Sequence, residues 1–334
     1  MNEERTTMPV SVLDLVPVRE GHTTKEALQD MVKLAKHVEE LGYQRFWLSE
    51  HHNTPTLASS ATSILIAKVL DNTESIEVGS GGIMLPNHTP LVVAEQFGTL
   101  ETMYPGRVNL GLGRAPGTDM RTAHALRRTN QETAFVFPQD VVELQTYLKS
   151  AQHQGTVHAH PGVGTEVPIF ILGSSTSSAQ LAARLGLPYV FAAHFAPQQL
   201  EQALHIYRSE FEPSEYLSKP YVMVCVNVIA AETNEEAETL STSSDLFYLN
   251  VVRGTQNLLQ PPVRSMDGRW NFYEESMVHG MSKYTFKGDR NTVSEQINRF
   301  CGELEIDELM AVSYIYDQEK RKRSYEILKD AIEQ

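Results

Sequence analysis

Short apolar segments alternate with helix-forming segments along almost the whole of this 334-residue chain. The apolar segments are continuous runs rather than alternations with polar residues, which is typical of parallel strands buried on both faces. Eight strands are predicted, at residues 10–16, 45–49, 76–79, 107–112, 168–172, 189–192, 221–230 and 308–313. Eight strands that alternate with helices are the pattern of a (β/α)8 TIM barrel, so the sequence predicts this α/β fold class.

Helices are predicted between these strands and after the last one. Thr23 or Thr24 can cap the first helix, and Gly42 can end it. The predicted helices cover residues 24–41, 59–70, 91–103, 177–185, 196–211 and 317–332, with another that begins near Asn234. Residues 115–149 are expected to be irregular or helical.

Residues 245–284 interrupt this rhythm between the seventh and eighth predicted strands. The segment contains a Pro261-Pro262 pair and several aromatic residues. Long connections inside compact domains often serve as lids or binding loops. Because no repeat or interdomain linker is visible, we predict a single domain over residues 1–334, with an insertion or lid at about 245–284.

The balance of charges limits the partners that this chain is expected to bind. It carries 42 acidic and 28 basic residues, a formal net charge of −14. That charge opposes binding to nucleic acid or to an anionic membrane, so neither partner is expected. The N-terminus lacks the apolar core of a signal peptide and no apolar run has the length of a membrane span, so a cytoplasmic location is expected. Cys225 and Cys301 form no CxxC pattern, which argues against a disulfide framework or a zinc cluster.

Glycines follow the third predicted strand and close the fourth. The two segments are Gly79-Ser80-Gly81-Gly82 and Gly111-Leu112-Gly113-Arg114. Ligands of parallel α/β folds bind at the C-terminal ends of the strands, and glycine lets the backbone lie close to a flat or charged group. These glycines indicate either a planar ligand against the backbone or tight packing between strand and helix.

A hydroxyl-rich segment, Gly173-Ser174-Ser175-Thr176-Ser177-Ser178, follows the fifth predicted strand and opens a helix. Backbone N–H groups, hydroxyls and the helix dipole at such a position favour an anion. A helix cap needs only one hydroxyl, so the sequence favours phosphate binding over a simple N-cap. Arg114 is the expected bidentate partner of that phosphate, with a surface salt bridge as its alternative.

Several histidines fall near the predicted ligand face. His51 and His52 follow the second strand, so one can face the mouth of the barrel while the other packs beneath a loop. A mouth histidine suits general acid/base catalysis, although both can instead be structural. His194, after the sixth strand, is compatible with a mouth, core or loop role. His158 and His160 have an HxH spacing in a connecting loop, and adjacent histidines do not easily chelate one ion, so no metal site is predicted.

Four stretches of the sequence resemble the bacterial luciferase-like family of flavin-dependent monooxygenases. They are RFWLSEHHN, VGSGGIMLPNHTPLVVAEQFGTLETMYPGRVNLGLGRAPGTD, PIFILGSSTSSAQLAARLGLPYVFA and DELMAVSYIYD. The second stretch is the most specific, and the resemblance covers essentially the whole chain. The chain is most similar to the uncharacterised single-chain branch of the family rather than to a luciferase subunit.

The resemblance implies a (β/α)8 barrel that binds FMN, as FMNH2, at its C-terminal mouth. The flavin ring would lie against Gly79, Ser80, Gly81, Gly82 and Gly113. A non-prolyl cis peptide would join Gly81 to Gly82. The phosphate would be held by Arg114, Ser174, Ser175 and Ser178, beside Gly173. His51 would match the catalytic histidine.

The implied activity is the oxygenation of a small organic substrate by FMNH2 and O2, with His51 as acid/base. A separate NAD(P)H:flavin reductase would supply FMNH2, and the family's dimers through the second and third helices imply a homodimer. Gly113 stands where luciferases carry a reactive cysteine, Ser174 stands where they carry a glutamate, and Ala115-Pro116-Gly117 also differs. The differences at Gly113 and at Ala115-Pro116-Gly117 argue against light emission and a long-chain aldehyde substrate, whereas Ser174 should favour the phosphate dianion.

Three other functions stay open at this point. A deazaflavin-dependent oxidoreductase of the same superfamily would transfer hydride without O2. A non-catalytic flavin-binding protein would bind FMN without turnover. A metal-dependent barrel hydrolase is the third alternative. Binding of the two cofactors, oxygenase turnover and elemental analysis would separate these functions.

Overall fold

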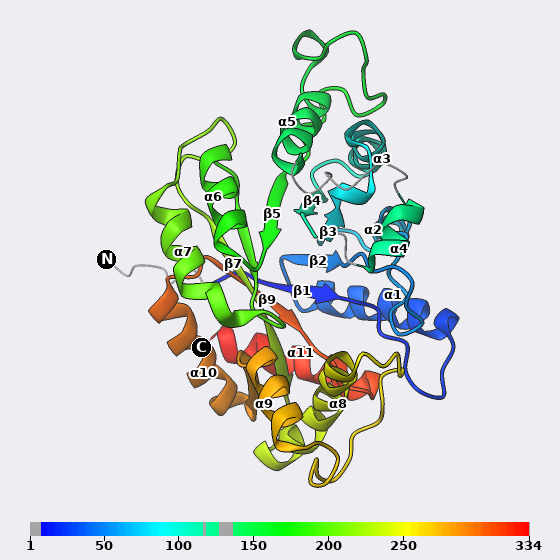
Figure 1. Ribbon diagram of the computed structural model, residues 1–334, viewed down its shortest axis with the longest axis vertical. Helices are drawn as coiled ribbons and strands as arrows, with labels where there is room; N and C mark the ends of the chain where they lie inside the picture. The colour runs from blue at the N-terminus through cyan, green and yellow to red at the C-terminus, as the bar shows by residue number, and fades with distance from the viewer. Residues whose placement is uncertain (1–7, 116–117, 127–135, 334) are drawn as a thin grey trace.

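A computed structural model describes residues 8–115, 118–126 and 136–333, and its strands form a closed parallel barrel (Figure 1). The barrel strands, in their order of pairing, are β1 (Val10–Asp14), β2 (Arg45–Leu48), β3 (Glu77–Met84), β4 (Val108–Gly113), β5 (Ile169–Gly173), β6 (Tyr189–Ala192), β7 (Val222–Ala230) and β9 (Glu308–Val312). β9 pairs with β1 and closes the ring. The predicted TIM barrel is confirmed. Pro116 and Gly117, which differ from the luciferase pattern, lie outside the described residues.

Strand β3 is longer than predicted. The sequence predicts its end at Gly79, whereas it continues to Met84. Its pairing with β4 shifts register between Ser80 and Ile83, and the Gly81-Gly82 peptide within that shift is cis, as the family resemblance implies. The strand resumes because β4 supplies new hydrogen-bond partners beyond the shift. That contact is a tertiary one, so the local sequence pattern does not contain it.

A further strand, β8 (Thr285–Gly288), lies beside the barrel rather than within it. It pairs with residues 227–230, the C-terminal part of β7, and is followed by α10 (Arg290–Leu304). The sequence predicts neither element. β8 has only 4 residues and depends on a distant strand for its hydrogen bonds, so it carries almost no local signal.

The predicted insertion at 245–284 contains regular structure. Helix α8 (Asn234–Arg253) begins where it is predicted and continues to Gly254, whose φ of +65° ends it. Beyond residue 254 the chain is irregular and leads into α9 (Phe272–Met281). Figure 1 shows α8 and α9 together at one end of the long axis.

The residues between these two helices, here called the 254–271 segment, are fixed to the connection that follows β1. Leu259 N donates to Val18 O at 2.9 Å, and Glu20 N donates to Leu259 O at 2.8 Å. Gln256 Nε2 also donates to Asn53 O, at 3.3 Å. The segment is thereby attached to the C-terminal end of the barrel, where parallel strands present ligand sites.

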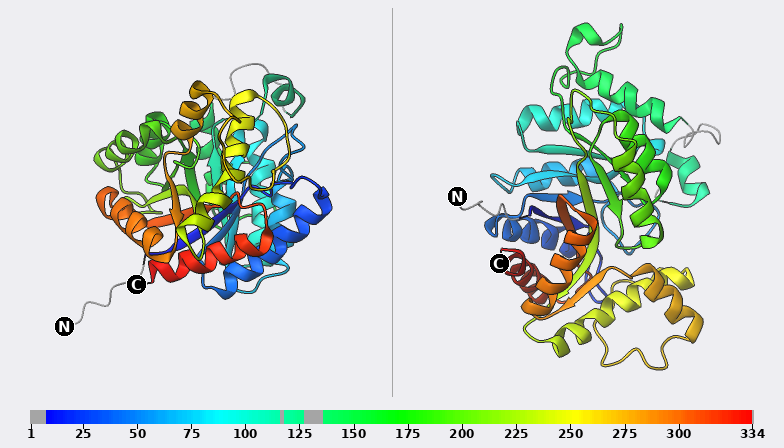
Figure 2. Two further views of the ribbon diagram at one scale, coloured as in Figure 1. Left: turned by 90° about the horizontal axis from the view of Figure 1, so that it is seen from below. Right: turned by 90° about the vertical axis from the view of Figure 1, so that its left-hand side faces the viewer.

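The remaining helices surround the barrel, and Figure 2 shows this arrangement from two further directions. They are α1 (Thr24–Glu40), α2 (Thr62–Leu70), α3 (Pro90–Met103), α4 (Met120–Leu126), α5 (Phe137–Leu148), α6 (Thr176–Leu185), α7 (Leu200–Ser209) and α11 (Gln318–Ile332). Thr23 caps α1 in a capping box. One apolar layer lies between helices and strands, and another fills the barrel around Trp47. None of the described helices is long and apolar enough to cross a membrane.

A buried ionic cluster closes the N-terminal end of the barrel. Glu308, the first residue of β9, is fully buried and accepts hydrogen bonds from Arg45 Nε at 3.1 and 3.2 Å. Tyr221 Oη donates to the same carboxylate at 2.6 Å, and Ser11 Oγ donates to it as well. Arg45 also pairs with Glu77. Because a buried charge is costly without partners, this cluster fixes the starts of several strands.

We expect Arg45→Ala to destabilise the protein by about 3–5 kcal/mol, because it leaves the buried Glu308 carboxylate without its cation. Urea unfolding followed by circular dichroism measures the change. Arg299→Ala is the matched control, since Arg299 pairs with Glu295 on the surface, where the two side chains are 63% and 73% exposed. Loss of such a pair has little effect on stability. Equal unfolding midpoints for Arg45→Ala and the wild type would contradict this role of the cluster.

Candidate functional site

A cavity of about 360 Å³, here called the inner cavity, opens at the C-terminal end of the barrel. Eight of the predicted site residues line it: His51, Gly81, Gly113, Arg114, Gly173, Ser174, Ser175 and Ser178. They come from the ends of β2, β3, β4 and β5 and from the start of α6. The fold therefore brings together, on the predicted face, residues that are far apart in the sequence.

Three other predicted site residues, Gly79, Ser80 and Gly82, do not line the inner cavity. A Cβ on Gly79 would lie 2.5 Å from the main-chain oxygen of Asn109, and one on Gly82 would lie 2.7 Å from that of Gly111. Ser80 Oγ donates to Gly111 O at 2.8 Å. These residues allow β3 and β4 to approach closely, so packing accounts for them.

The part of the inner cavity that lies within the barrel is apolar. It is formed by Leu13, Leu172, Val190, Cys225 and Met310. Burial raises the pKa of the Cys225 thiol far above its ordinary range, so this group stays neutral and unreactive. Such a surface suits a flat and uncharged ring system.

The other end of the inner cavity is polar and meets the start of α6. Ser175 is the N-cap residue of this helix but makes no capping hydrogen bond. Thr176 N donates to Gln199 Oε1 at 3.0 Å. This end offers hydrogen-bond donors and positive charge that suit an anion. They are the remaining N–H groups of the first turn, the partly exposed hydroxyls of Ser174 and Ser175, and the exposed Arg114.

Ser178 has a more internal position than the other serines. Its hydroxyl donates to Ser175 O at 2.7 Å and bonds to Tyr189 Oη at 3.0 Å. A Cβ on Gly173 would lie 2.0 Å from Ser178 Oγ, so the glycine makes room for this hydroxyl. Ser178 therefore fixes, from its buried side, the shape of the turn at residues 174–178, here called the serine turn.

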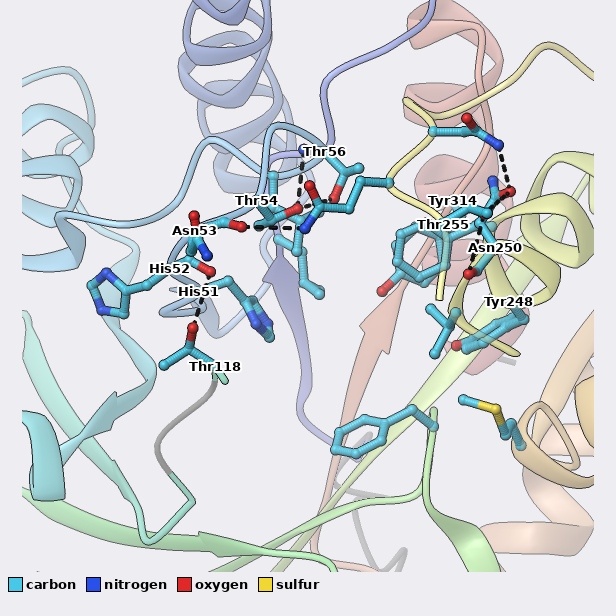
Figure 3. Close-up of a pocket in the computed structure, with 18 of the residues that line it drawn as sticks. His51, His52, Asn53, Thr54, Thr56, Thr118, Tyr248, Asn250, Thr255 and Tyr314 are labelled. Carbon is cyan, nitrogen blue, oxygen red and sulfur yellow. Dashed lines mark hydrogen bonds between the residues drawn. The ribbon is translucent and has the colours of Figure 1, made fainter. Parts of the chain in front are cut away.

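A second cavity of about 440 Å³, here called the outer cavity, adjoins the inner one. The residues common to both cavities are Leu15, His51, His194 and Phe195. Figure 3 shows the connection after β2 on one side of the outer cavity, and Tyr248 and Tyr314 on the other. The His51 ring points toward the two tyrosines, whereas the His52 ring points away from them. His51 thus lies at the boundary where molecules in the two cavities could meet.

The carboxylate of Glu50 is a part of the site that the sequence reasoning missed. Glu50 is 1% exposed, and it accepts hydrogen bonds from Met84 N at 2.9 Å, His52 Nε2 at 2.8 Å and His88 Nε2 at 2.9 Å. Burial alone raises the pKa of Glu50, but the hydrogen bonds from His52 and His88 and the charge of His88 lower it to about 2. The carboxylate therefore stays charged and joins the end of β2 to the end of β3.

Strand geometry explains how Glu50 positions His51. Successive residues of an extended chain face opposite sides, so Glu50 and His52 share one side and His51 takes the other. Glu50 lines neither cavity. Its hydrogen bonds nevertheless hold the end of β3, at Met84, and the connection after β2, at His52. An acidic residue directly before a mouth histidine at a strand end is the signal that could have identified it.

His194, whose role the sequence leaves open, lines both cavities and is 6% exposed. Its main-chain oxygen accepts hydrogen bonds from Asn227 Nδ2 at 2.7 Å and from Tyr248 Oη at 2.6 Å. Burial, together with the charge of nearby His51, lowers the pKa of His194 to about 3. The imidazole is therefore neutral at ordinary pH, with one N–H donor and one nitrogen acceptor.

His158 and His160 lie in an exposed connection and line neither cavity. Their rings contact each other edge to face, with 5.9 Å between the ring centroids. Within the described part of the chain, no three His, Cys, Asp or Glu side chains are grouped so that they could hold a metal ion.

Comparison with known proteins identifies similar sequences and structures. The model of a family described as luciferase-like monooxygenase matches residues 8–301. A protein named luciferase-like monooxygenase from Escherichia coli strain K12 is 47% identical over 328 residues, which cover 98% of each protein. The crystal structure of apo-MsnO8 has 33% identity and a TM-score of 0.88 over 98% of both chains. The FMN complex of the oxygenating constituent of 3,6-diketocamphane monooxygenase from Pseudomonas putida shares the fold, with 18% identity and a TM-score of 0.75 over 97% of both chains.

We expect Glu50→Gln to destabilise the protein by about 3 kcal/mol at pH 7, because the pKa of the Glu50 carboxyl falls from 4.5 to about 2 on folding. The unfolded carboxylate binds a proton below pH 4.5, so the wild type loses this stability as the pH falls toward 2. At about pH 3 the difference in the free energy of unfolding between the wild type and Glu50→Gln should be roughly half of its value at pH 7.

Urea unfolding of both proteins at the two pH values measures this change. Glu295→Gln is the control, because the Glu295 side chain is 73% exposed. A destabilisation by Glu50→Gln that is equal at both pH values would show that the buried charge is not its cause.

Proposed function

The chain belongs to the luciferase-like monooxygenase family, and we propose that it uses FMNH2 and O2 to oxygenate a small organic substrate. The observation that carries this proposal is the pair of adjoining cavities at the mouth of the barrel, with His51 at their boundary. Reduced FMN, when bound, supplies the electrons that activate O2. On this proposal the inner cavity holds the cofactor and the outer cavity holds the substrate.

The residues of the inner cavity fit FMN. Its apolar part offers a surface for the flavin ring, next to the main chain at Gly81 and Gly113. Its polar end offers hydroxyls of Ser174 and Ser175, the start of α6 and the guanidinium of Arg114 to the phosphate. The volume of about 360 Å³ lies within the usual range for small-molecule sites.

His51 is the proposed acid/base residue. An imidazole changes its protonation near neutral pH, so it can hold or accept a proton where a substrate meets the cofactor. The hydrogen bonds of Glu50 support this role, because they hold the end of β2 and leave the His51 ring facing the cavities. Closure of the outer cavity by α8 and the 254–271 segment would limit the access of water to this position.

We further propose that a separate NAD(P)H:flavin reductase supplies FMNH2 in the cytoplasm and that the protein is a homodimer. Helices α2 and α3 contact each other and carry the exposed apolar side chains Ile64, Val92 and Met103, which are 68%, 42% and 59% exposed. A second copy of the chain would cover them. Sedimentation analysis should give the mass of a dimer, and a monomer at every concentration would contradict this part of the proposal.

We expect Arg114→Ala to weaken the binding of FMNH2 about tenfold, because a charge-assisted contact to the phosphate is lost. Reduced riboflavin, which lacks the phosphate, should bind equally to both proteins. Anaerobic titration followed by protein fluorescence measures both affinities. Arg184→Ala is the matched control, since Arg184 lies exposed at the far end of α6. A similar loss of affinity for both flavins would place the phosphate elsewhere.

Oxygenation is tested by supplying the protein with FMN, NADH, a flavin reductase, 18O2 and a panel of small organic substrates. Mass spectrometry should find 18O in a product, and His51→Asn should reduce the rate by at least about a hundredfold while it keeps FMNH2 affinity. FMNH2 binding without 18O incorporation would favour the non-catalytic flavin-binding alternative. Turnover with a deazaflavin cofactor and no O2 would favour the deazaflavin-dependent oxidoreductase.

A further inference from the structure

The outer cavity has a distinctive distribution of charge. Among the described residues that line it, none is a lysine or arginine, and Asp119 is the one carboxylic acid. Each oxygen of the Asp119 carboxylate accepts two hydrogen bonds, from donors on Asn53, Arg121 and Thr122. The hydrogen-bond acceptor positions of both carboxylate oxygens are therefore occupied by groups of the protein. An anionic group in the cavity would meet no lysine or arginine, only the imidazoles of His51 and His52, and a cationic group would meet only a carboxylate whose acceptor positions are occupied by these donors.

The wall of the outer cavity opposite the β2 connection is aromatic. The rings of Phe247 and Tyr314 are stacked, with 4.2 Å between their centroids and 19° between their planes. Phe195, at the boundary with the inner cavity, is 44% exposed although it is a large apolar side chain. Such surfaces favour contact with a flat apolar molecule. The volume of about 440 Å³ suits a small molecule rather than a polymer.

His194 supplies a polar group at the same boundary. Its Nδ1 atom is buried and has no hydrogen-bond partner among the described residues. The ring contacts Phe195 edge to face, with 4.8 Å between the centroids. Asn227 and Tyr248 hold the main-chain oxygen of His194, and the ring itself makes a hydrogen bond to the main chain of Cys225. A neutral imidazole that lines both cavities can bond to an uncharged polar group without a charge to balance.

We propose that the outer cavity binds an uncharged, flat and largely apolar substrate whose polar group hydrogen-bonds to the imidazole of His194. The inference rests on the proposed function, because it takes the outer cavity as the place where the substrate meets the flavin. It adds the chemical class of the substrate and a second histidine that contacts it, beside His51.

Three probes of nearly the same shape test the charge preference: benzamide, benzoate and benzamidinium, which are neutral, anionic and cationic. Their dissociation constants are measured by ligand-observed NMR with the FMN-loaded full-length protein and with the flavin-free protein. Benzamide should bind at least about tenfold more tightly than either charged probe, because the cavity offers no lysine or arginine to the anion and no carboxylate with open acceptor positions to the cation. Equal or tighter binding of benzoate or benzamidinium, or no binding of benzamide, would overturn the proposal.

Variants of His194 test the hydrogen bond. His194→Phe should weaken benzamide binding about tenfold, whereas His194→Asn, which keeps a hydrogen-bonding group, should retain part of the affinity. His205→Phe is the matched control, because His205 is exposed on α7. His205→Phe should leave the melting temperature and the FMN affinity of the wild type unchanged. Both quantities are also measured for the His194 variants, so that a loss of benzamide affinity is compared only among folded, FMN-loaded proteins. Equal benzamide affinity of the wild type and His194→Phe would overturn the contact with His194.

The two proposals fail in different ways. FMN binding with no preference among the three probes would overturn the substrate class and leave the proposed function intact. A preference for benzamide in a protein that binds neither FMN nor FMNH2 would overturn the proposed function and leave the outer cavity as a site for an uncharged ligand.

Discussion

The hydrogen bonds of the Glu50 carboxylate connect three parts of the molecule that are separate in the sequence. They reach Met84 at the end of β3, His88 in the following connection, and His52 after β2. A buried carboxylate is unfavourable unless each oxygen has donors, so these contacts constrain one another. The direction of the His51 ring, and with it the boundary between the two cavities, follows from this constraint. The opposite end of the barrel has a similar arrangement around Glu308 and Arg45, which fixes the strand starts.

Much of the barrel could be predicted from the sequence because its strands are continuous apolar runs separated by clear helix signals. The convergence of Arg114 with the serine turn could also be predicted, since the ends of parallel strands share one face. The course of β3 beyond Gly79 could not, because it depends on a register shift against β4. Strand β8 could not, because its partner lies more than fifty residues away in β7. Glu50 was missed because an acidic residue at a strand end is ordinarily exposed.

The glycines show why the same residue type needs two explanations. Gly79 and Gly82 have no room for a side chain because main-chain atoms of β4 lie against them. Gly81 and Gly113 also have close neighbours, but they additionally line the inner cavity. The sequence presents all four alike, as glycines at the ends of two neighbouring strands. Only the position of β4 separates those that serve the approach of two strands from those that border the proposed cofactor site.

The attachment of the 254–271 segment has a consequence for how substrate preference can diverge. The segment joins the ends of two helices, and the main chain of Leu259 holds it to the connection after β1. Residues 255–257 contribute to the outer cavity but not to the inner one. Amino-acid replacements there can therefore reshape one compartment while the other keeps its donors and its apolar surface. On the proposed function, exchange of this connection would direct the same chemistry to other molecules.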